Sequence, residues 1–246
     1  MANTDYKSPD ALMRHLRDNG ISISGSSQKQ QLINTGYFHG YKGYRFFVSS
    51  SNRLPFTSYN EINATIQYDT KLKSLLYGKM MFIETALKNI ALNTIMSEID
   101  SSSIYDMYDK AISSYKNAPA GTREDIKKKY QNNKLNLQGS IQNAIAHNDV
   151  VYDTRFKKMD PSRPMKQCLI LEMGMPYINF KTIGDYIILI CYYLKLLKVS
   201  KTEIKSFIRE FEKITREYES SVTPNVSAIT IHPDLFSRLN ILKNSI

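Results

Sequence analysis

The feature that most constrains the fold is a long helical period of apolar side chains between residues 68 and 95. Apolar residues recur there every three or four positions, and Gly78 is the only glycine or proline in the interval. Such a stripe predicts an amphipathic helix of about seven turns. The stripe consists of Leu72, Leu75, Leu76, Met80, Ile83, Leu87, Ile90, Ala91 and Ile95.

Two further segments carry the same period. Residues 183–197 are apolar on nearly every side, which is typical of a helix at the centre of a bundle. Residues 202–218 have apolar side chains on one face and charges on the other. We therefore predict an all-α, mostly helical fold with these three helices as its scaffold.

Shorter helices and turns complete the predicted organisation. Residues 36–57 are rich in Gly, Tyr and Phe and are expected to hold short extended pieces, and 153–164 form a basic loop. A small N-terminal subregion, 1–57, precedes a helical bundle, 58–246, although the two could equally form one continuous unit. The short predicted helices span 9–18, 28–35, 104–115, 122–134, 137–147 and 233–243.

The charge balance points to an anionic partner. The chain of 246 residues has 33 Lys and Arg against 23 Asp and Glu, a net charge of +10, and nucleic acid is the first candidate for such an excess. The longest apolar run, 186–194, is too short to cross a membrane, and no signal-peptide core is present. Cys168 and Cys191 suggest neither a disulfide framework nor a zinc site. We expect a cytoplasmic protein that makes no use of a membrane.

The signatures of the common enzyme classes are absent from the sequence. The four histidines are scattered, and none lies in an HExxH or HxH spacing, so we expect no metal. The chain lacks GxxxxGK[ST], GxGxxG and GxSxG motifs, so we expect no nucleotide cofactor and no hydrolase nucleophile of those types.

One local group of polar residues remains, at the end of the predicted helix 137–147. Asn143 and His147 lie one helical turn apart on the same face, while Ala144 and Ile145 can pack inward. The helix dipole favours a protonated imidazole at this end, which suits a group that acts at a phosphate. The alternative is a helix-ending histidine with a purely structural role.

The segment from Gln142 to His147 resembles the Arg-Asn-x-x-Ala-His signature of HEPN domains in the Abi-like proteins of abortive infection. Residues 32–38 and 68–88 are also similar to that family, and the resemblance covers about 8–200. It implies a HEPN-like helical bundle that forms a homodimer, and a metal-independent endoribonuclease. In such an enzyme the RNA 2′-hydroxyl attacks the adjacent phosphate, and His147 takes part in proton transfer or phosphate contact.

Other positions of the family pattern can be assigned in the same way. Asn143 takes the polar position of the motif, and Glu84 with Lys88 matches a Glu-x-x-x-Lys element on the long helix. A simple surface ion pair is the alternative for these two residues. Gln142 stands where the family carries arginine, and it can offer no charge to a phosphate. Losing such a donor commonly lowers a rate by about 10²–10³.

Basic residues concentrate around this motif. Residues 121–166 contain ten basic and five acidic side chains, a local charge of +5. Tyr152 lies among these bases and could stack on unpaired RNA bases, although packing in the core is the alternative. The predicted RNA-binding residues are Lys127, Lys128, Lys129, Arg155, Lys157, Lys158 and Tyr152.

Three functions therefore remain open. The first is an RNA-cleaving phage-defence protein, weakened by Gln142 or assisted by another base. The second is a non-catalytic RNA-binding module held in complex with a noncoding RNA. The third is a helical protein adaptor, whose binding to nucleic acid would follow charge alone.

Overall fold

The structure is a computed structural model that describes residues 8–98, 144–155 and 162–246. The predicted helices 104–115 and 122–134, and most of 137–147, lie outside these ranges. Described helices account for all the regular secondary structure, which confirms the all-α prediction for these residues. They are α1 (Pro9–Asp18), α2 (Gly25–Thr35), the π-helix η1 (Tyr37–Lys42), α3 (Tyr59–Glu98), α7 (Arg163–Glu172), α8 (Ile183–Leu196), α9 (Lys201–Ser221), α10 (Pro224–Thr230) and α11 (Leu235–Ser245).

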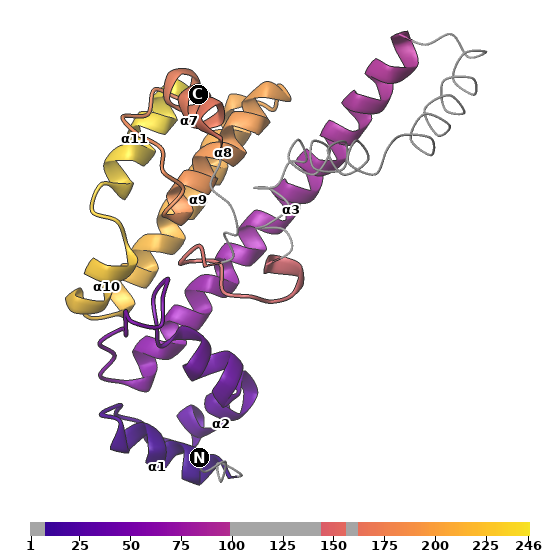
Figure 1. The fold of residues 1–246 in the computed structure, drawn as a ribbon. Coiled ribbons are helices and arrows are strands. Elements are labelled where there is room, and N and C mark those ends of the chain that lie inside the picture. Colours follow the sequence, from indigo (N-terminus) through magenta and orange to yellow (C-terminus); the bar gives the residue numbers. More distant parts are fainter. Residues whose placement is uncertain (1–7, 99–143, 156–161) are drawn as a thin grey trace, which may run out of the picture.

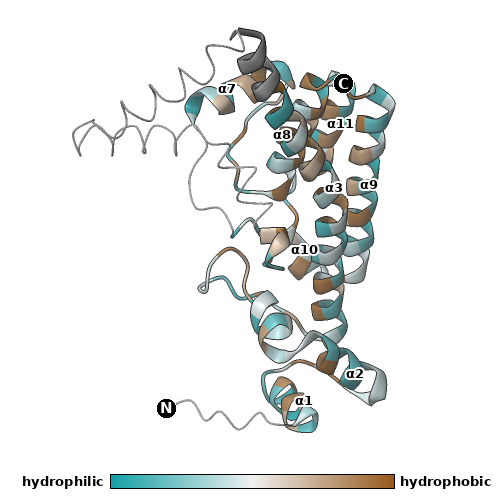
Figure 2. Ribbon diagram, turned by 90° about the vertical axis from the view of Figure 1, so that its right-hand side faces the viewer, coloured by the Kyte–Doolittle hydropathy of each residue, from teal (hydrophilic) through white to brown (hydrophobic). Residues whose placement is uncertain are grey.

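The long helix α3 and its neighbour α9 form the axis of the molecule (Figure 1). They run antiparallel, because Lys71 pairs with Glu217 at 2.7 Å while Lys79, two turns later, pairs with Glu203 at 2.5 Å. The C-terminal end of α3 projects away from the other described helices (Figure 1). Hydrophobic and hydrophilic residues alternate along both helices (Figure 2), as expected where one face is buried.

The core between these helices contains aromatic rings as well as aliphatic side chains. Tyr68 of α3 stacks on Tyr218 of α9 with ring centroids 4.4 Å apart, and its hydroxyl lies 3.2 Å from the hydroxyl of Thr215. Helices α8 and α11 pack on α9, and α7 packs on α8. As its composition predicts, α8 is buried on almost every side.

Helix α3 begins at Tyr59, nine residues before the apolar stripe that predicts it. The additional turns follow from a capping box in which Ser58 and Glu61 each accept a hydrogen bond from the other's backbone N–H, at 3.4 and 3.1 Å. The Glu61 carboxylate also accepts from the N–H and hydroxyl of Thr223, at 3.0 and 2.7 Å. One buried carboxylate therefore holds the start of α3 against the start of α10.

The N-terminal part of the chain differs from expectation in its local structure. The range 36–57 was expected to hold extended pieces, but part of it forms the π-helix η1. Its extended structure in the described residues is limited to an isolated antiparallel bridge between Phe46 and Arg53. Helices α7 and α10 were not predicted. A proline stands in the first turn of each, and Ser162 caps α7 by accepting from the N–H of Met165 at 3.4 Å.

Two negative findings apply to the described ranges alone. None of their helices combines the length and apolar character needed to cross a bilayer. Nor do the residues of these ranges bring three or more His, Cys, Asp or Glu side chains together as metal ligands.

Candidate functional site

The structure places His147 at the end of a short helical segment, 144–146, with its side chain exposed. The chain leaves this segment in a Schellman motif. The N–H of Asp149 donates to the oxygen of Ala144 at 2.7 Å, and the N–H of Asn148 donates to the oxygen of Ile145 at 3.1 Å. Asn148 takes the left-handed conformation that this motif requires, with φ 55°. The imidazole therefore stands at the negative end of a helical segment, as predicted.

The segment that follows His147 is fixed by a buried carboxylate on α3. Asp69 is fully buried, and its Oδ1 accepts from the backbone N–H groups of Val151 and Tyr152, both at 2.8 Å. Its Oδ2 accepts from the hydroxyl of Tyr44 at 2.7 Å and pairs with the Nζ of Lys73 at 2.9 Å. Burial, followed by the negative charge of Asp69, raises the pKa of the Tyr44 phenol, which therefore stays a donor.

Lys73 connects this carboxylate to the residue beside His147. Its Nζ donates to the Oδ1 of Asn148 at 2.8 Å and to the backbone oxygen of the same residue at 3.4 Å. We refer to Tyr44, Asp69, Lys73 and Asn148 as the Asp69 cluster. Because every oxygen of its carboxylate is engaged, the cluster compensates the desolvation of a buried charge and gives His147 a rigid support.

A second ion pair fixes the same segment to the N-terminal part of the chain. Asp153 is 1% exposed and accepts from the N–H of Val48 at 2.9 Å and from the Nε of Arg155 at 2.8 Å. Arg155 also donates to the backbone oxygens of Gly43 and Phe46, at 2.8 and 2.7 Å. Its guanidinium binds the chain's own acceptors, so Arg155 has a structural role, and its contact with RNA stays a prediction.

The structure also corrects the expectation for Tyr152. Its side chain is 2% exposed and packs against Tyr44, Phe47 and Tyr68, with ring centroids 5.6 to 6.2 Å away. A ring in this position is not accessible to an RNA base, so the alternative of core packing applies to it.

The remaining predicted residues are not brought together by the described structure. Glu84 and Lys88 form an i,i+4 ion pair on α3, in which the Lys88 side chain is 73% exposed. Glu84 lies eleven residues beyond Lys73, about 16 Å further along the helix axis. The other predicted residues lie outside the described ranges: Gln142, Asn143, Lys127, Lys128, Lys129, Lys157 and Lys158.

Sequence analysis missed the Asp69 cluster and the Asp153–Arg155 pair. Asp69 and Lys73 are an i,i+4 pair, Asp153 and Arg155 lie two residues apart, and Tyr44 and Asp69 lie 25 residues apart. The other partners lie 75 to 112 residues apart in the chain. The pair of Asp69 and Lys73 was the available signal, because Asp69 sits on the apolar side of a strongly predicted helix, where a carboxylate requires a partner.

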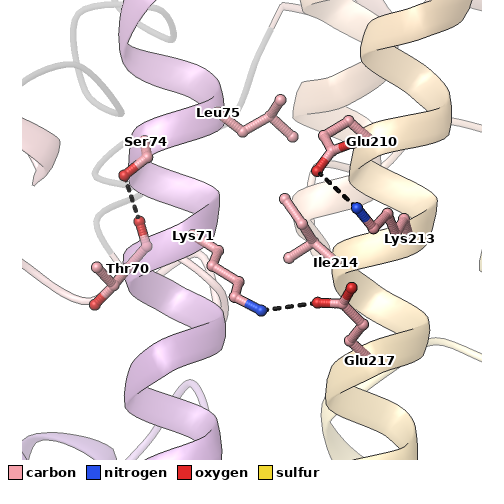
Figure 3. Close-up of a pocket in the computed structure, with 8 residues that line it drawn as sticks. All are labelled: Thr70, Lys71, Ser74, Leu75, Glu210, Lys213, Ile214 and Glu217. Atoms are coloured by element: carbon pink, nitrogen blue, oxygen red, sulfur yellow. Dashed lines mark hydrogen bonds and ion pairs between the residues drawn. The ribbon is translucent and has the colours of Figure 1, made fainter.

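An open groove of about 460 Å³ lies between α3 and α9 (Figure 3). Lys71 faces Glu217 across it, and Lys213 lies 3.9 Å from Glu210 on the α9 side. The two cations are balanced by two carboxylates, so this groove offers no excess charge to a polyanion.

Comparison with known proteins identifies a family for this chain. The sequence model of the family described as Abi-like protein matches residues 30–165, which is more than half of the chain. The chain therefore belongs to the Abi-like protein family, whose name associates it with abortive infection. The matched range contains the Asp69 cluster, His147 and the Asp153–Arg155 pair. No curated protein matches, and neither does any solved structure.

Proposed function

We propose that the chain is an abortive-infection protein that acts on RNA, as a metal-independent endoribonuclease of the HEPN type with His147 at its catalytic centre. The observation that carries the proposal is the exposed imidazole on a segment fixed by buried charges. Among the described residues no hydrogen bond to His147 is found, and its side chain is exposed. Family membership supports the defence role.

The chemistry requires no cofactor. The 2′-hydroxyl of RNA attacks the adjacent phosphorus, and the bond to the 5′-oxygen breaks. The products are a 2′,3′-cyclic phosphate and a 5′-hydroxyl end. His147 transfers a proton to or from one of these oxygens, and Asn143 takes the polar position of the motif one turn earlier. The basic residues of 121–166 would attract the RNA backbone through their charge.

The Asp69 cluster has a positioning role in this proposal. Within the cluster, Lys73 holds Asn148, the neighbour of His147. A general acid or base must be held within hydrogen-bond reach of its target, so a segment pinned at Asn148, Val151 and Tyr152 favours a defined imidazole position. A homodimer with two such segments facing one cleft belongs to the same proposal.

The test is cleavage of single-stranded RNA and tRNA by the purified protein in EDTA. Products should carry 5′-hydroxyl ends, which polynucleotide kinase labels without prior phosphatase treatment. His147→Ala should remove the activity, whereas His39→Ala, at an exposed histidine of η1, should retain it. Equal cleavage by both variants would contradict the role of His147.

A second candidate function is a non-catalytic RNA-binding module in complex with a noncoding RNA. Gln142 favours it, because a neutral amide cannot replace the guanidinium that the motif uses on phosphate. This candidate predicts stable RNA binding by the unmodified protein, no cleavage of any substrate, and little loss of affinity in His147→Ala.

A further inference from the structure

A cavity of about 240 Å³ lies at the N-terminus of α8, apart from His147. It is lined by the start of α8, by residues of the segment from 228 to 235 that leads from α10 into α11, and by Phe47, Tyr68 and Tyr152 from three further parts of the chain. A cavity of roughly 150 Å³ is enough for a benzene ring, so this one accommodates a small organic molecule.

The start of α8 forms one wall of this cavity. Thr182, Ile183 and Gly184 all line it, and α8 has no side-chain N-cap bond. Among the described residues, no acceptor forms a hydrogen bond with the N–H group of Ile183 or of Gly184. The acid of this first turn, Asp185, is buried and paired with Arg238 at 2.5 Å, and it does not line the cavity. Free N–H groups at a helix N-terminus favour an anion.

Two buried hydroxyls in the same walls lack a partner in the described structure. The Tyr152 side chain is 98% buried and its hydroxyl makes no hydrogen bond, and the same holds for the buried Oγ1 of Thr182. Burial raises the pKa of the Tyr152 phenol, so it remains an O–H donor. A buried hydroxyl without a partner is destabilising, so a ligand atom that bonded either hydroxyl would gain a hydrogen bond at little cost.

Two further polar side chains of the cavity, His232 and Lys181, can each donate a hydrogen bond. His232 accepts from the N–H of Asp234 at its Nδ1, at 3.2 Å, so the proton of the neutral ring sits on Nε2. Lys181 is exposed at the rim, and its Nζ has no partner among the described residues. None of the described lining residues is an aspartate or glutamate.

We propose that this cavity binds a small phosphate monoester. The phosphate lies against the N-terminus of α8, where the N–H groups, the hydroxyls of Tyr152 and Thr182, and Lys181 surround it with donors. The organic part occupies the apolar remainder, lined by residues such as Ile183, Ile231 and Leu235. A free sugar phosphate or nucleotide and the 5′-phosphorylated end of an RNA share this chemistry. The site does not depend on the nuclease proposal, because it contains no residue of the His147 motif.

The test is isothermal titration calorimetry on the full chain. The probes are ribose 5-phosphate, adenosine 5′-monophosphate, adenosine, and a short RNA with and without a 5′-phosphate. Phosphorylated probes should bind and adenosine should not. If only the phosphorylated RNA binds, the natural ligand is the 5′-phosphorylated end of an RNA. If the small esters bind, the natural ligand is a free sugar phosphate or nucleotide.

Substitutions of the lining residues test whether the phosphorylated probes bind in this cavity. Tyr152→Phe should weaken their binding at least about tenfold, because a donor to a charged group is lost. It should not lower the melting temperature of the ligand-free protein, since the deleted hydroxyl has no partner there. Thr182→Val should weaken binding as well, and it serves as the second variant if Tyr152→Phe folds poorly.

Lys181→Met should weaken binding severalfold, whereas Lys201→Met should not. Lys201 is the matched control because it opens α9, whose N-terminus is capped by Ser200, and the change in charge is identical. The proposal is overturned if no phosphorylated probe binds at millimolar concentration, if Tyr152→Phe and Thr182→Val both bind normally, or if both lysine variants weaken binding equally. Normal phosphate binding by His147→Ala would separate this site from the nuclease.

Discussion

Asp69 is a single buried carboxylate on which three separate parts of the chain converge. It accepts from Tyr44 of the N-terminal part and from the backbone of Val151 and Tyr152, and it pairs with Lys73 on its own helix. Replacing one member of such a group leaves the others buried without partners, so the cost exceeds the value of any one bond.

We expect Asp69→Asn to lower the free energy of unfolding by about 3 kcal/mol or more, because Lys73 then stays buried without its counter-charge. Urea denaturation followed by circular dichroism measures this change. Asp18→Asn, at an exposed aspartate on α1, should change the same quantity by less than about 0.5 kcal/mol. A loss below about 1 kcal/mol in Asp69→Asn would contradict the structural role of the cluster.

The lowered pKa of Glu61 predicts how the free energy of unfolding depends on pH. Burial opposes ionisation of this carboxyl, but the hydrogen bonds from Thr57 and Thr223 outweigh it and lower the pKa of Glu61 in the folded protein. The folded state therefore holds the proton less tightly than the unfolded state, whose pKa is about 4.3. The resulting stabilisation is complete above that value and is lost as the pH falls through the folded pKa.

The measurement is urea unfolding of the unmodified protein and of Glu61→Gln between pH 3 and 7. The unmodified protein should be the more stable at pH 7, and its advantage should shrink as the pH falls below about 4.3. An advantage that is independent of pH would show that the ionised carboxylate is not what stabilises this junction.

At the scale of elements, the loop around Val48 stores backbone strain. Val48 has φ 63°, a left-handed conformation that β-branched residues rarely adopt, and its N–H is held by Asp153. Its side chain is 53% exposed, so little packing is lost on substitution. Val48→Asn should therefore stabilise the protein by up to about 1 kcal/mol, measured by thermal unfolding.

Val48→Ile is the matched control for this prediction, because it keeps the branched side chain and the strain. It should show no gain in melting temperature. Destabilisation by Val48→Asn would indicate that the valine side chain, rather than the N–H bond to Asp153, holds the loop.

Most long helices could be predicted from sequence, because the apolar repeat that defines each of them lies within a single short stretch of the chain. The stripes of 68–95, 183–197 and 202–218 repeat every three to four residues, and each lies in α3, α8 or α9 with only the ends displaced. The start of α3 was missed because polar residues precede the stripe, although Ser58 and Glu61 carry a capping-box spacing. Helices α7 and α10 lack a clear apolar period.

The site could be predicted only in part. The position of His147 at a helix end follows from a short local motif, and the structure agrees. The contacts of Arg155 with Gly43 and Phe46 cross more than a hundred residues, and no local pattern reports them. Tyr152 was assigned to RNA because its neighbours are basic, whereas its own side chain faces the core.

At the scale of the whole molecule, the predicted division at residue 57 crosses a set of buried bonds. Tyr44 reaches Asp69, Val48 reaches Asp153, and Thr57 reaches Glu61. A chain of residues 58–246 would leave both aspartates without these donors. We expect it to lose cooperative unfolding, whereas the full chain should melt in one transition detected by circular dichroism and tyrosine fluorescence. A truncated chain with its own sharp transition would support two separate units.

The central claim is that His147 performs chemistry on RNA, and its most direct test measures cleavage and binding together. Cleavage rates and dissociation constants for one end-labelled RNA would be determined in EDTA for the unmodified protein, His147→Ala and Gln142→Arg. We predict that His147→Ala abolishes cleavage while its affinity changes by less than about twofold, and that Gln142→Arg raises the rate by about 10²–10³. If no variant cleaves, including Gln142→Arg, while all bind RNA equally, the nuclease account is wrong and the protein is an RNA-binding module.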